Sequence, residues 1–108
     1  MINIMILKLI FIEIIDKISY VFDTAYFGKG IIIHYGVYVG PDTSIGNFCH
    51  LDTNCIIEHD CNLGSNVLVC PGVIIENDVF IGAGTTIINS TINKEIRLHE
   101  KCFTRLVQ

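Results

Sequence analysis

The sequence has few basic residues and no basic stripe with interleaved aromatic side chains. It carries 7 lysines and arginines against 11 aspartates and glutamates, and its formal net charge is −4 over 108 residues. Proteins that bind nucleic acids usually present a positively charged patch, often with interleaved aromatic side chains. The acidic balance therefore argues against a nucleic-acid partner, and the length indicates one small acidic domain.

The chain also lacks an uninterrupted apolar run and a processing signal. A membrane-spanning helix needs about twenty apolar residues, and the apolar segment 1–20 is interrupted by Lys8, Glu13, Asp16 and Lys17. A secretory signal would start with basic residues and end at small ones, and neither feature is present. The cysteine count, five, is odd. These features favour free thiols in a reducing compartment, and hence a cytoplasmic location.

What the sequence does have is a repeat of six residues. Every sixth residue from Phe27 to Ile87 is large and apolar. An α-helix needs apolar residues every three or four positions, and a simple strand needs them at every second one. A strict period of six fits neither pattern alone, but it fits a short strand followed by a corner, repeated along the chain.

Turn residues locate the corners. The fourth residue of each hexad is Gly, Asn or Asp in nine of eleven repeats, and both prolines occupy the third position. This is the pattern of a type II turn, in which a residue that tolerates positive φ follows proline. Glycine also recurs every eighteen residues, at Gly28, Gly46, Gly64 and Gly82. Three hexads therefore make one coil, and the sequence predicts an all-β fold, a parallel β-helix of about four triangular coils.

The repeat defines a single domain over residues 1–108, with its coils in residues 21–92. Residues 1–20 lack the turn pattern. We expect them to form a strand or helix that caps the open end of the stack, because an uncovered terminal coil exposes unpaired backbone groups. An apolar surface used for self-association is the alternative for this segment.

Residues 93–108 are expected to form a second, helical cap. Their basic residues recur at spacings of three and four: Lys94, Arg97, Lys101 and Arg105. Such a stripe is commonly a solvated helix face. The alternative is a contact with the phosphates of a nucleotide-type cofactor.

One outward face of the predicted triangle is apolar. The residue before each inward aliphatic points outward, and on this face these residues lie eighteen apart: Tyr38, Ile56, Ile74 and Ile92. An apolar ladder of this size is too large to leave in contact with water. It predicts a subunit interface, which a threefold assembly of prisms would use once per chain.

The corner after Ile56 carries the candidate catalytic group. His59 borders the apolar face and has Glu58 and Asp60 as its neighbours. A neutral imidazole can take a proton near neutral pH, and an adjacent carboxylate can fix its tautomer and stabilise its charged form. This combination could deprotonate an amine or hydroxyl as it attacks an acyl group. The alternative is a surface histidine at a turn with incidental acidic neighbours.

Several stretches resemble the hexapeptide-repeat acyltransferases, in the branch that acetylates sugars. They are residues 45–50 (Ile-Gly-Asn-Phe-Cys-His), 63–68 (Leu-Gly-Ser-Asn-Val-Leu) and 56–61 (Ile-Ile-Glu-His-Asp-Cys). The resemblance implies a left-handed β-helix, a homotrimer, acetyl-CoA as acyl donor, and a sugar or nucleotide-sugar as acceptor. It also implies that His59 is the general base and Asp60 its orienting partner.

The same resemblance implies that acetyl-CoA lies between neighbouring subunits and runs along the later coils. The candidate contacts there are Gly72, Asn77, Gly82, Ala83 and Gly84. The Gly-Ala-Gly stretch also satisfies the corner rule, so a purely structural explanation competes with cofactor binding. The chain departs from the family pattern with Asp52 in place of a frequent asparagine, Leu68 in place of a histidine, and Asn77 in place of a glycine.

Other chemistries have less support. His34 and His50 lie on outer surfaces away from the His59 corner, and the eighteen-residue neighbours of His59 are Pro41 and Asn77, which are not zinc ligands. The sequence therefore predicts no metal site. The rival to an enzyme is a truncated, non-catalytic β-helical scaffold or oligomerisation module.

Overall fold

The computed structural model describes residues 14–88, 91–92 and 103–104, and these residues form strands and turns without a helix. Every strand is two residues long. From β4 (Ile32–Ile33) to β14 (Thr91–Ile92), the second residue of each strand is buried and the first is more exposed. This alternation is the one expected of a strand with one face on a core, and from β4 to β13 (Thr86–Ile87) it confirms the predicted inward positions.

The strands form three parallel sheets. Sheet A contains β1 (Ile14–Ile15), β4, β7 (His50–Leu51), β10 (Leu68–Val69), β13 (Thr86–Ile87) and β15 (Phe103–Thr104). Sheet B contains β2 (Tyr20–Val21), β5 (Tyr38–Val39), β8 (Ile56–Ile57), β11 (Ile74–Ile75) and β14. Sheet C contains β3 (Tyr26–Phe27), β6 (Ser44–Ile45), β9 (Asn62–Leu63) and β12 (Phe80–Ile81).

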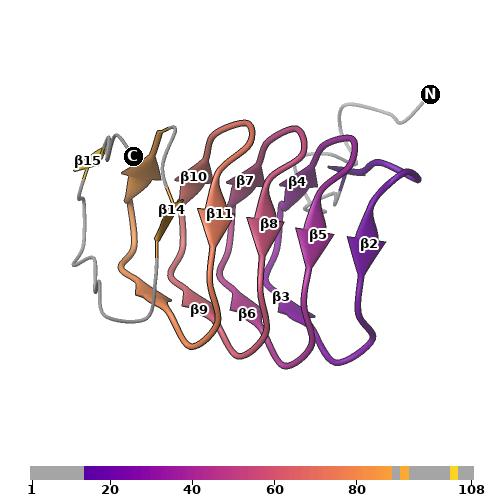
Figure 1. The fold of residues 1–108 in the computed structure, drawn as a ribbon, viewed down its shortest axis with the longest axis horizontal. Helices are drawn as coiled ribbons and strands as arrows, with labels where there is room; N and C mark the ends of the chain where they lie inside the picture. Colours follow the sequence, from indigo (N-terminus) through magenta and orange to yellow (C-terminus); the bar gives the residue numbers. More distant parts are fainter. Residues whose placement is uncertain (1–13, 89–90, 93–102, 105–108) are drawn as a thin grey trace, which may run out of the picture.

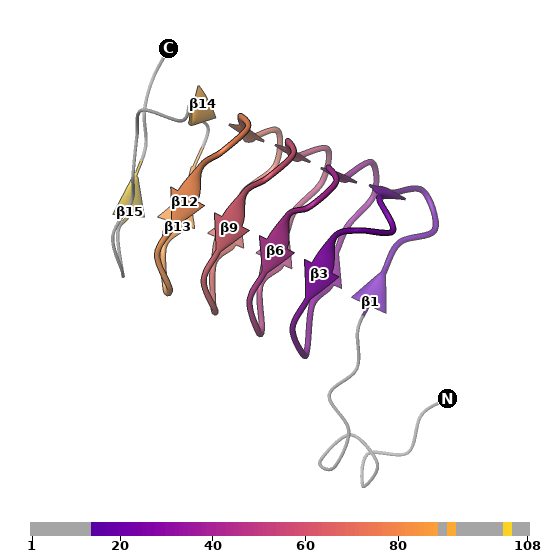
Figure 2. The same ribbon diagram turned by 90° about the horizontal axis from the view of Figure 1, so that it is seen from below.

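Successive coils stack with a register of eighteen residues. Tyr38 pairs with Ile56, and Ile56 in turn with Ile74. In Figure 1 the chain descends the near face in β5 and β8, passes the lower edge in β6 and β9, and returns on the far face in β7 and β10. Because the coils advance from right to left, the winding is left-handed. Figure 2 shows the sheet C strands in a row, and the fold is the predicted left-handed parallel β-helix of about four coils.

The core is a column of aliphatic side chains along the axis. Of the eleven predicted inward positions, Phe27 near one end is half-buried and the other ten are buried. The residue four places after each of these positions, which is β-branched or a cysteine, also points inward and is buried from Ile31 to Thr85. Two of its members are threonines, and three are the free cysteines Cys49, Cys55 and Cys61.

Ten consecutive corners adopt positive φ at the predicted residue. They are Gly30, Gly36, Asp42, Phe48, Asn54, Asp60, Asn66, Gly72, Asp78 and Gly84. Nine of these are Gly, Asn or Asp, which reach this region at little cost. Phe48 is the exception, at φ 57°. The turn rule of the sequence is therefore confirmed, including at a residue whose own preference opposes it.

The glycines spaced by eighteen stack at the corner between sheets C and A. A Cβ atom on Gly46 would lie 2.6 Å from the backbone carbon of Gly64, and one on Gly64 would lie 2.7 Å from the backbone nitrogen of Ala83. Both distances are far inside van der Waals contact. Glycine recurs here because consecutive coils approach too closely for any side chain.

The last coil departs from the predicted register. Ile92 is buried and pairs with Ile75, while Thr91 pairs with the outward Ile74. The prediction that Ile92 completes the outward apolar ladder is therefore wrong. A strict period would assign the inward place to Asn93; a step of five residues from Ile87 instead supplies an aliphatic side chain to the core, which avoids burying an amide.

The structure describes parts of both predicted caps, and in the N-terminal one it shows strands, one of the two predicted forms. Ile14–Ile15 pairs with β4 and Tyr20–Val21 with β5, so regular coil begins before residue 21. Phe103–Thr104 forms a strand on β13, so the helical prediction is wrong at these two residues. Residues 1–13 and the basic positions of the C-terminal stripe lie outside the described residues. Within the described part, no helix is long and apolar enough to cross a membrane.

Candidate functional site

His59 lies where the sequence predicts it, on the corner between sheets B and C. Strand β8 ends at Ile57, and His59 and Asp60 form the turn that follows. The turn is held in the stack from both sides. The Asp60 amide donates to the Pro41 carbonyl in the coil before (3.0 Å), and the Asp78 amide of the coil after donates to the His59 carbonyl (3.2 Å). The backbone that carries the imidazole is thus fixed by interior coils.

The imidazole of His59 contacts the carboxylate of the next residue. Its Nδ1 lies 2.7 Å from Oδ2 of Asp60, and the two side chains are 48% and 51% exposed. This hydrogen bond raises the pKa of His59. Partial desolvation lowers that pKa, whereas the negative charges of Asp60, Asp78 and Glu58 raise it further. The site is therefore an exposed imidazole whose charged form is stabilised by carboxylates.

The contact also selects the reactive nitrogen. When Nδ1 donates to Asp60, the lone pair of a neutral ring is on Nε2. Among the described residues, none hydrogen-bonds to Nε2 of His59. That nitrogen is consequently available to accept a proton from a molecule bound beside the corner.

A buried threonine that was not predicted as a site residue supports this corner from within. The Thr43 hydroxyl donates to the Glu58 carbonyl (2.7 Å) and accepts from the Cys61 amide (3.3 Å), so it joins the two ends of the turn. Thr43 is 1% exposed. The signal in the sequence was a hydroxyl in an inward slot that is otherwise held mainly by Val, Ile or Cys.

Gly40 leaves room for the same turn. A Cβ atom there would lie 2.8 Å from both the Glu58 carbonyl carbon and the His59 amide nitrogen. Gly40 is buried in the preceding coil. Any larger residue at this position would push the His59 backbone outward.

The outward face of sheet B borders the corner and is hollowed. A depression of about 440 Å³ is lined by Gly36, Tyr38, Asn54, Ile56 and Glu58. Tyr38, Ile56 and Ile74 are half-buried on this face and follow each other in register. The hollow therefore joins the apolar ladder to Glu58, the residue before His59 in the chain. A second hollow, of about 300 Å³, lies near Tyr20 and Asp23, at the far end of the stack.

The five predicted cofactor contacts do not gather at one place in a single chain. Gly72 and Asn77 lie at the two corners that flank β11, whereas Gly82, Ala83 and Gly84 lie at the corner between sheets C and A. That corner does not border sheet B. The Asn77 amide donates to Asp78 (2.8 Å), and a Cβ on Gly72 would meet nothing within 4 Å. Of the predicted site residues, the structure brings His59 and Asp60 into contact.

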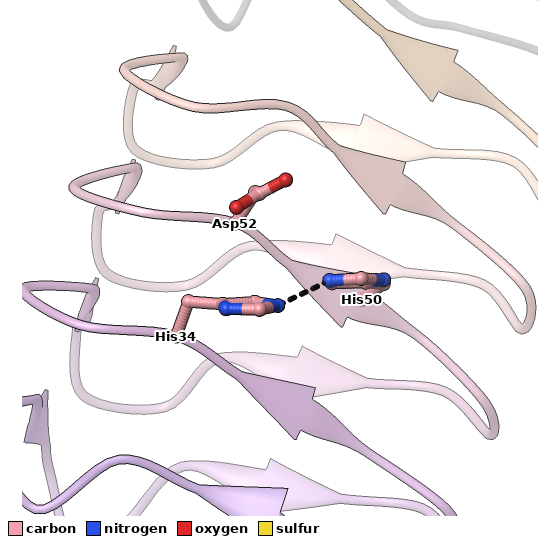
Figure 3. A group of neighbouring side chains, drawn as sticks. All are labelled: His34, His50 and Asp52. Atoms are coloured by element: carbon pink, nitrogen blue, oxygen red, sulfur yellow. Dashed lines mark hydrogen bonds between the residues drawn. The ribbon is translucent and has the colours of Figure 1, made fainter.

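A second group of polar side chains lies at the end of sheet A. His34, His50 and Asp52 each offer a ligand atom, and these atoms lie within 4.8 Å of one another (Figure 3). Asp52 is the eighteen-residue neighbour of His34, and this spacing is the signal in the sequence for their proximity.

Comparison with known proteins agrees with this architecture. Residues 54–89, which include His59, match the family model described as the bacterial transferase hexapeptide, six repeats. Residues 54–89 thus carry the six-residue repeat of this transferase family. The predicted resemblance is thereby confirmed.

Curated relatives of this hexapeptide-repeat chain modify sugars. A GDP-perosamine N-acetyltransferase from Escherichia coli is 33% identical over 84 residues, covering 72% of this chain and 38% of that protein. An acyl-[acyl-carrier-protein]–UDP-N-acetylglucosamine O-acyltransferase from Brucella ovis is 36% identical over 56 residues, covering 52% of this chain and 18% of that protein. The chain thus spans well under half of the length of these relatives.

Solved structures share the fold at lower identity. The acetyltransferase domain of PglB from Neisseria gonorrhoeae has a TM-score of 0.60 at 18% identity, covering 88% of this chain and 50% of that one. A mutant GDP-perosamine N-acetyltransferase from Caulobacter crescentus, in complex with CoA and GDP-perosamine, has a TM-score of 0.55 at 20% identity, covering 86% and 52%. At these identities the likeness concerns the fold.

Proposed function

We propose that this chain is an acetyl-CoA-dependent acetyltransferase that acts on an amine or hydroxyl of a sugar or nucleotide-sugar. The observation that carries the proposal is the contact between Nδ1 of His59 and the Asp60 carboxylate on an exposed corner. This contact leaves the lone pair of a neutral ring on Nε2, which can then act as a base. The corner lies within the residues that match the hexapeptide transferase model. The GDP-perosamine N-acetyltransferase relative supports an amino group on a nucleotide-sugar as the preferred acceptor.

The proposed reaction needs one proton carrier. The acceptor nitrogen or oxygen attacks the thioester carbonyl carbon while Nε2 of His59 takes the proton from the attacking atom. The carbon–sulfur bond then breaks, and the imidazolium returns the proton to the leaving thiolate, which gives CoA and the acetylated acceptor. Asp60 stabilises the imidazolium between these two steps. No covalent enzyme intermediate is required.

We further propose that sheet B is an interface in a homotrimer. The half-buried apolar ladder of Tyr38, Ile56 and Ile74 supports this, because its side chains form a continuous outward stripe beside the hollow. In such an assembly the two edges of sheet B would carry Gly72 and Asn77 toward neighbouring chains. Acetyl-CoA would then lie between subunits, close to His59.

The direct test is turnover of acetyl-CoA by the 108-residue chain with a panel of nucleotide-aminosugars. Free CoA is quantified by chromatography, since the chain's own thiols would consume a thiol reagent. We expect turnover with at least one aminosugar, and a loss of about 10²–10⁴-fold in His59→Ala, the usual contribution of a general base. Circular dichroism checks that the variant keeps the β-helix.

Asp42→Asn serves as the matched control, because Asp42 occupies the same turn position as Asp60 one coil earlier. It should retain turnover. The alternative function is a non-catalytic scaffold. It remains an alternative because the match covers 38% of the GDP-perosamine N-acetyltransferase. Absence of acetyl-CoA binding in a calorimetric titration at millimolar ligand would end the enzyme proposal, and a trimer that is unchanged by loss of His59 would then support the scaffold.

A further inference from the structure

Two histidines and an aspartate converge where the sheet A strands β4 and β7 end. The strands pair in parallel, with Ile32 beside His50 and Ile33 beside Leu51. His34 therefore follows β4 directly below Asp52, which follows β7. His50 is two residues before Asp52 and so points to the same outer side. All three side chains are half-buried.

The two imidazoles face each other. Figure 3 shows the rings of His34 and His50 meeting at their edges, with Asp52 one coil above His34. The Nε2 atoms are 2.6 Å apart, and the rings lie at 12° to each other with centroids separated by 4.6 Å. Two nitrogens this close cannot both carry a proton. At least one lone pair is therefore directed into the space between the rings.

The carboxylate is partly fixed by its neighbour. Oδ1 of Asp52 accepts from the Thr53 amide (2.7 Å) and from the Thr53 hydroxyl (3.3 Å). The second oxygen remains for another partner. Hydrogen bonds to a ligating carboxylate are a common way in which proteins orient metal ligands.

We propose that His34, His50 and Asp52 bind a divalent transition-metal ion, with Zn²⁺ as the probe. Two imidazole nitrogens and a carboxylate oxygen form a three-ligand set that Zn²⁺ accepts, with a fourth position left for water. Tetrahedral Zn–N bonds of about 2.0–2.1 Å place two nitrogens about 3.3 Å apart. The two Nε2 atoms therefore need to separate by about 0.7 Å, and the carboxylate oxygen, which lies within 4.8 Å of the ring nitrogens, needs to approach them by up to about 1.5 Å. Half-buried side chains achieve such changes by rotation.

The ion would replace the proton shared between the rings. Both histidines must then be neutral, so zinc and protons compete for the site. The site is separate from the proposed base: His59 is on the corner between sheets B and C, whereas the cluster is at the edge between sheets A and B. This inference does not rest on the acetyltransferase proposal.

The test is calorimetric titration of ZnCl₂ into untagged, chelator-treated 108-residue chain. We expect one Zn²⁺ per chain and a higher melting temperature with zinc. Even outer partners of metal sites change affinity by about 10–100-fold, so His34→Ala and His50→Ala should each weaken binding at least tenfold. His59→Gln, a matched loss of one histidine, and Cys70→Ser, which removes the nearest half-buried thiol above Asp52, should bind as the wild type does.

A measurement on the unmodified chain guards against variants that fail to fold. Zinc should shift the imidazole proton resonances of His34 and His50 and leave those of His59 in place. The proposal is overturned by an absence of saturable binding, by unmoved His34 and His50 resonances, or by affinity that depends on Cys70 or His59 instead.

Discussion

The orientation of His59 depends on its neighbour in sequence. His59 and Asp60 share one turn, and Asp60 has φ 59° there. The contact between Nδ1 and the carboxylate is therefore a local product of the corner, while Thr43 and Gly40 fix the backbone beneath it. The chemistry and the support of this site can be separated by substitution.

Asp60→Asn should move the pH dependence of turnover. The hydrogen bond to Asp60 is the largest cause of the raised pKa of His59. A general base works when neutral, so activity falls as the pH drops through that pKa. Without the carboxylate charge the pKa of His59 falls, and the acidic limb of the kcat/KM profile should move to lower pH, with a reduced plateau.

Asparagine tolerates positive φ, so the turn should persist in this variant. Asp42→Asn, at φ 57° in the coil before, is the matched control and should leave the acidic limb in place. An acidic limb that stays fixed or moves upward in Asp60→Asn would contradict the assignment of Asp60.

Thr43→Val should destabilise the fold by about 1–3 kcal/mol, although the two side chains have nearly the same shape. The substitution leaves the Glu58 carbonyl and the Cys61 amide without the buried hydroxyl that joins them, and a buried polar group without its partner costs about this amount. Urea denaturation measures the free energy of unfolding. Thr43→Ser keeps the hydroxyl and should lose less; equal stability of all three proteins would refute the role of this bond.

The strand-and-corner unit is the element from which the fold is built, and its sequence rule is strong. Gly, Asn and Asp predicted nine of the ten consecutive corners with positive φ, because these residues are chosen for the backbone rather than for a partner, and the repeat itself predicted the tenth, at Phe48. The same rule located His59. It could not predict the Asp60 contact distance, which depends on the turn's detailed geometry.

Two features were not predicted from the sequence because they depend on contacts between residues of different coils. Ile92 enters the core through a step of five residues, since burial of an aliphatic side chain outweighs a strict period. In the His34–His50–Asp52 group, Asp52 is stacked one coil above His34, whereas His50 lies diagonally from His34. A search for stacked pairs finds His34 with Asp52, but His50 is found only when outward positions two residues apart are also compared.

Two glycine substitutions should separate close packing from backbone conformation. Gly46→Ala places a Cβ 2.6 Å from the Gly64 backbone, and this clash can be relieved only by parting two coils. We expect a loss of about 3 kcal/mol, the upper part of the usual range for overpacking. Gly72→Ala has open space but φ +74°, so the strain of the left-handed conformation should cost about 1–2 kcal/mol.

Chemical denaturation of both variants gives the comparison. A Gly72→Ala variant less stable than Gly46→Ala would mean that the coils can part easily. The glycines stacked between sheets C and A would then not be what sets the distance between coils at this corner.

At the scale of the whole molecule, the prism has three faces of different character. The outward residues of sheet B from β5 to β11 are Tyr, Ile and Ile, whereas sheet C presents Ser44 and Asn62 in its middle strands. Apolar stripes of this kind are typical of subunit interfaces. The proposed trimer therefore depends on one face.

Ile56→Glu should convert the proposed trimer to monomers. It places a charge in the middle of the apolar ladder, where an interface would bury it without a partner. Asn62→Glu adds the same charge to the exposed first position of the next strand in the chain, on sheet C, and should leave assembly unchanged. Sedimentation velocity distinguishes the two states. A wild-type chain that sediments as a monomer would remove the interface from the proposed site.

The central place of β8 in sheet B has a further consequence. Two strands lie on each side of it, in the order β14, β11, β8, β5 and β2. In a stack where each coil touches only its neighbours, fraying begins at the ends and travels inward one coil at a time. The segment bearing His59 is thus the last to lose its pairing, and heat should abolish its chemistry only when the whole column melts.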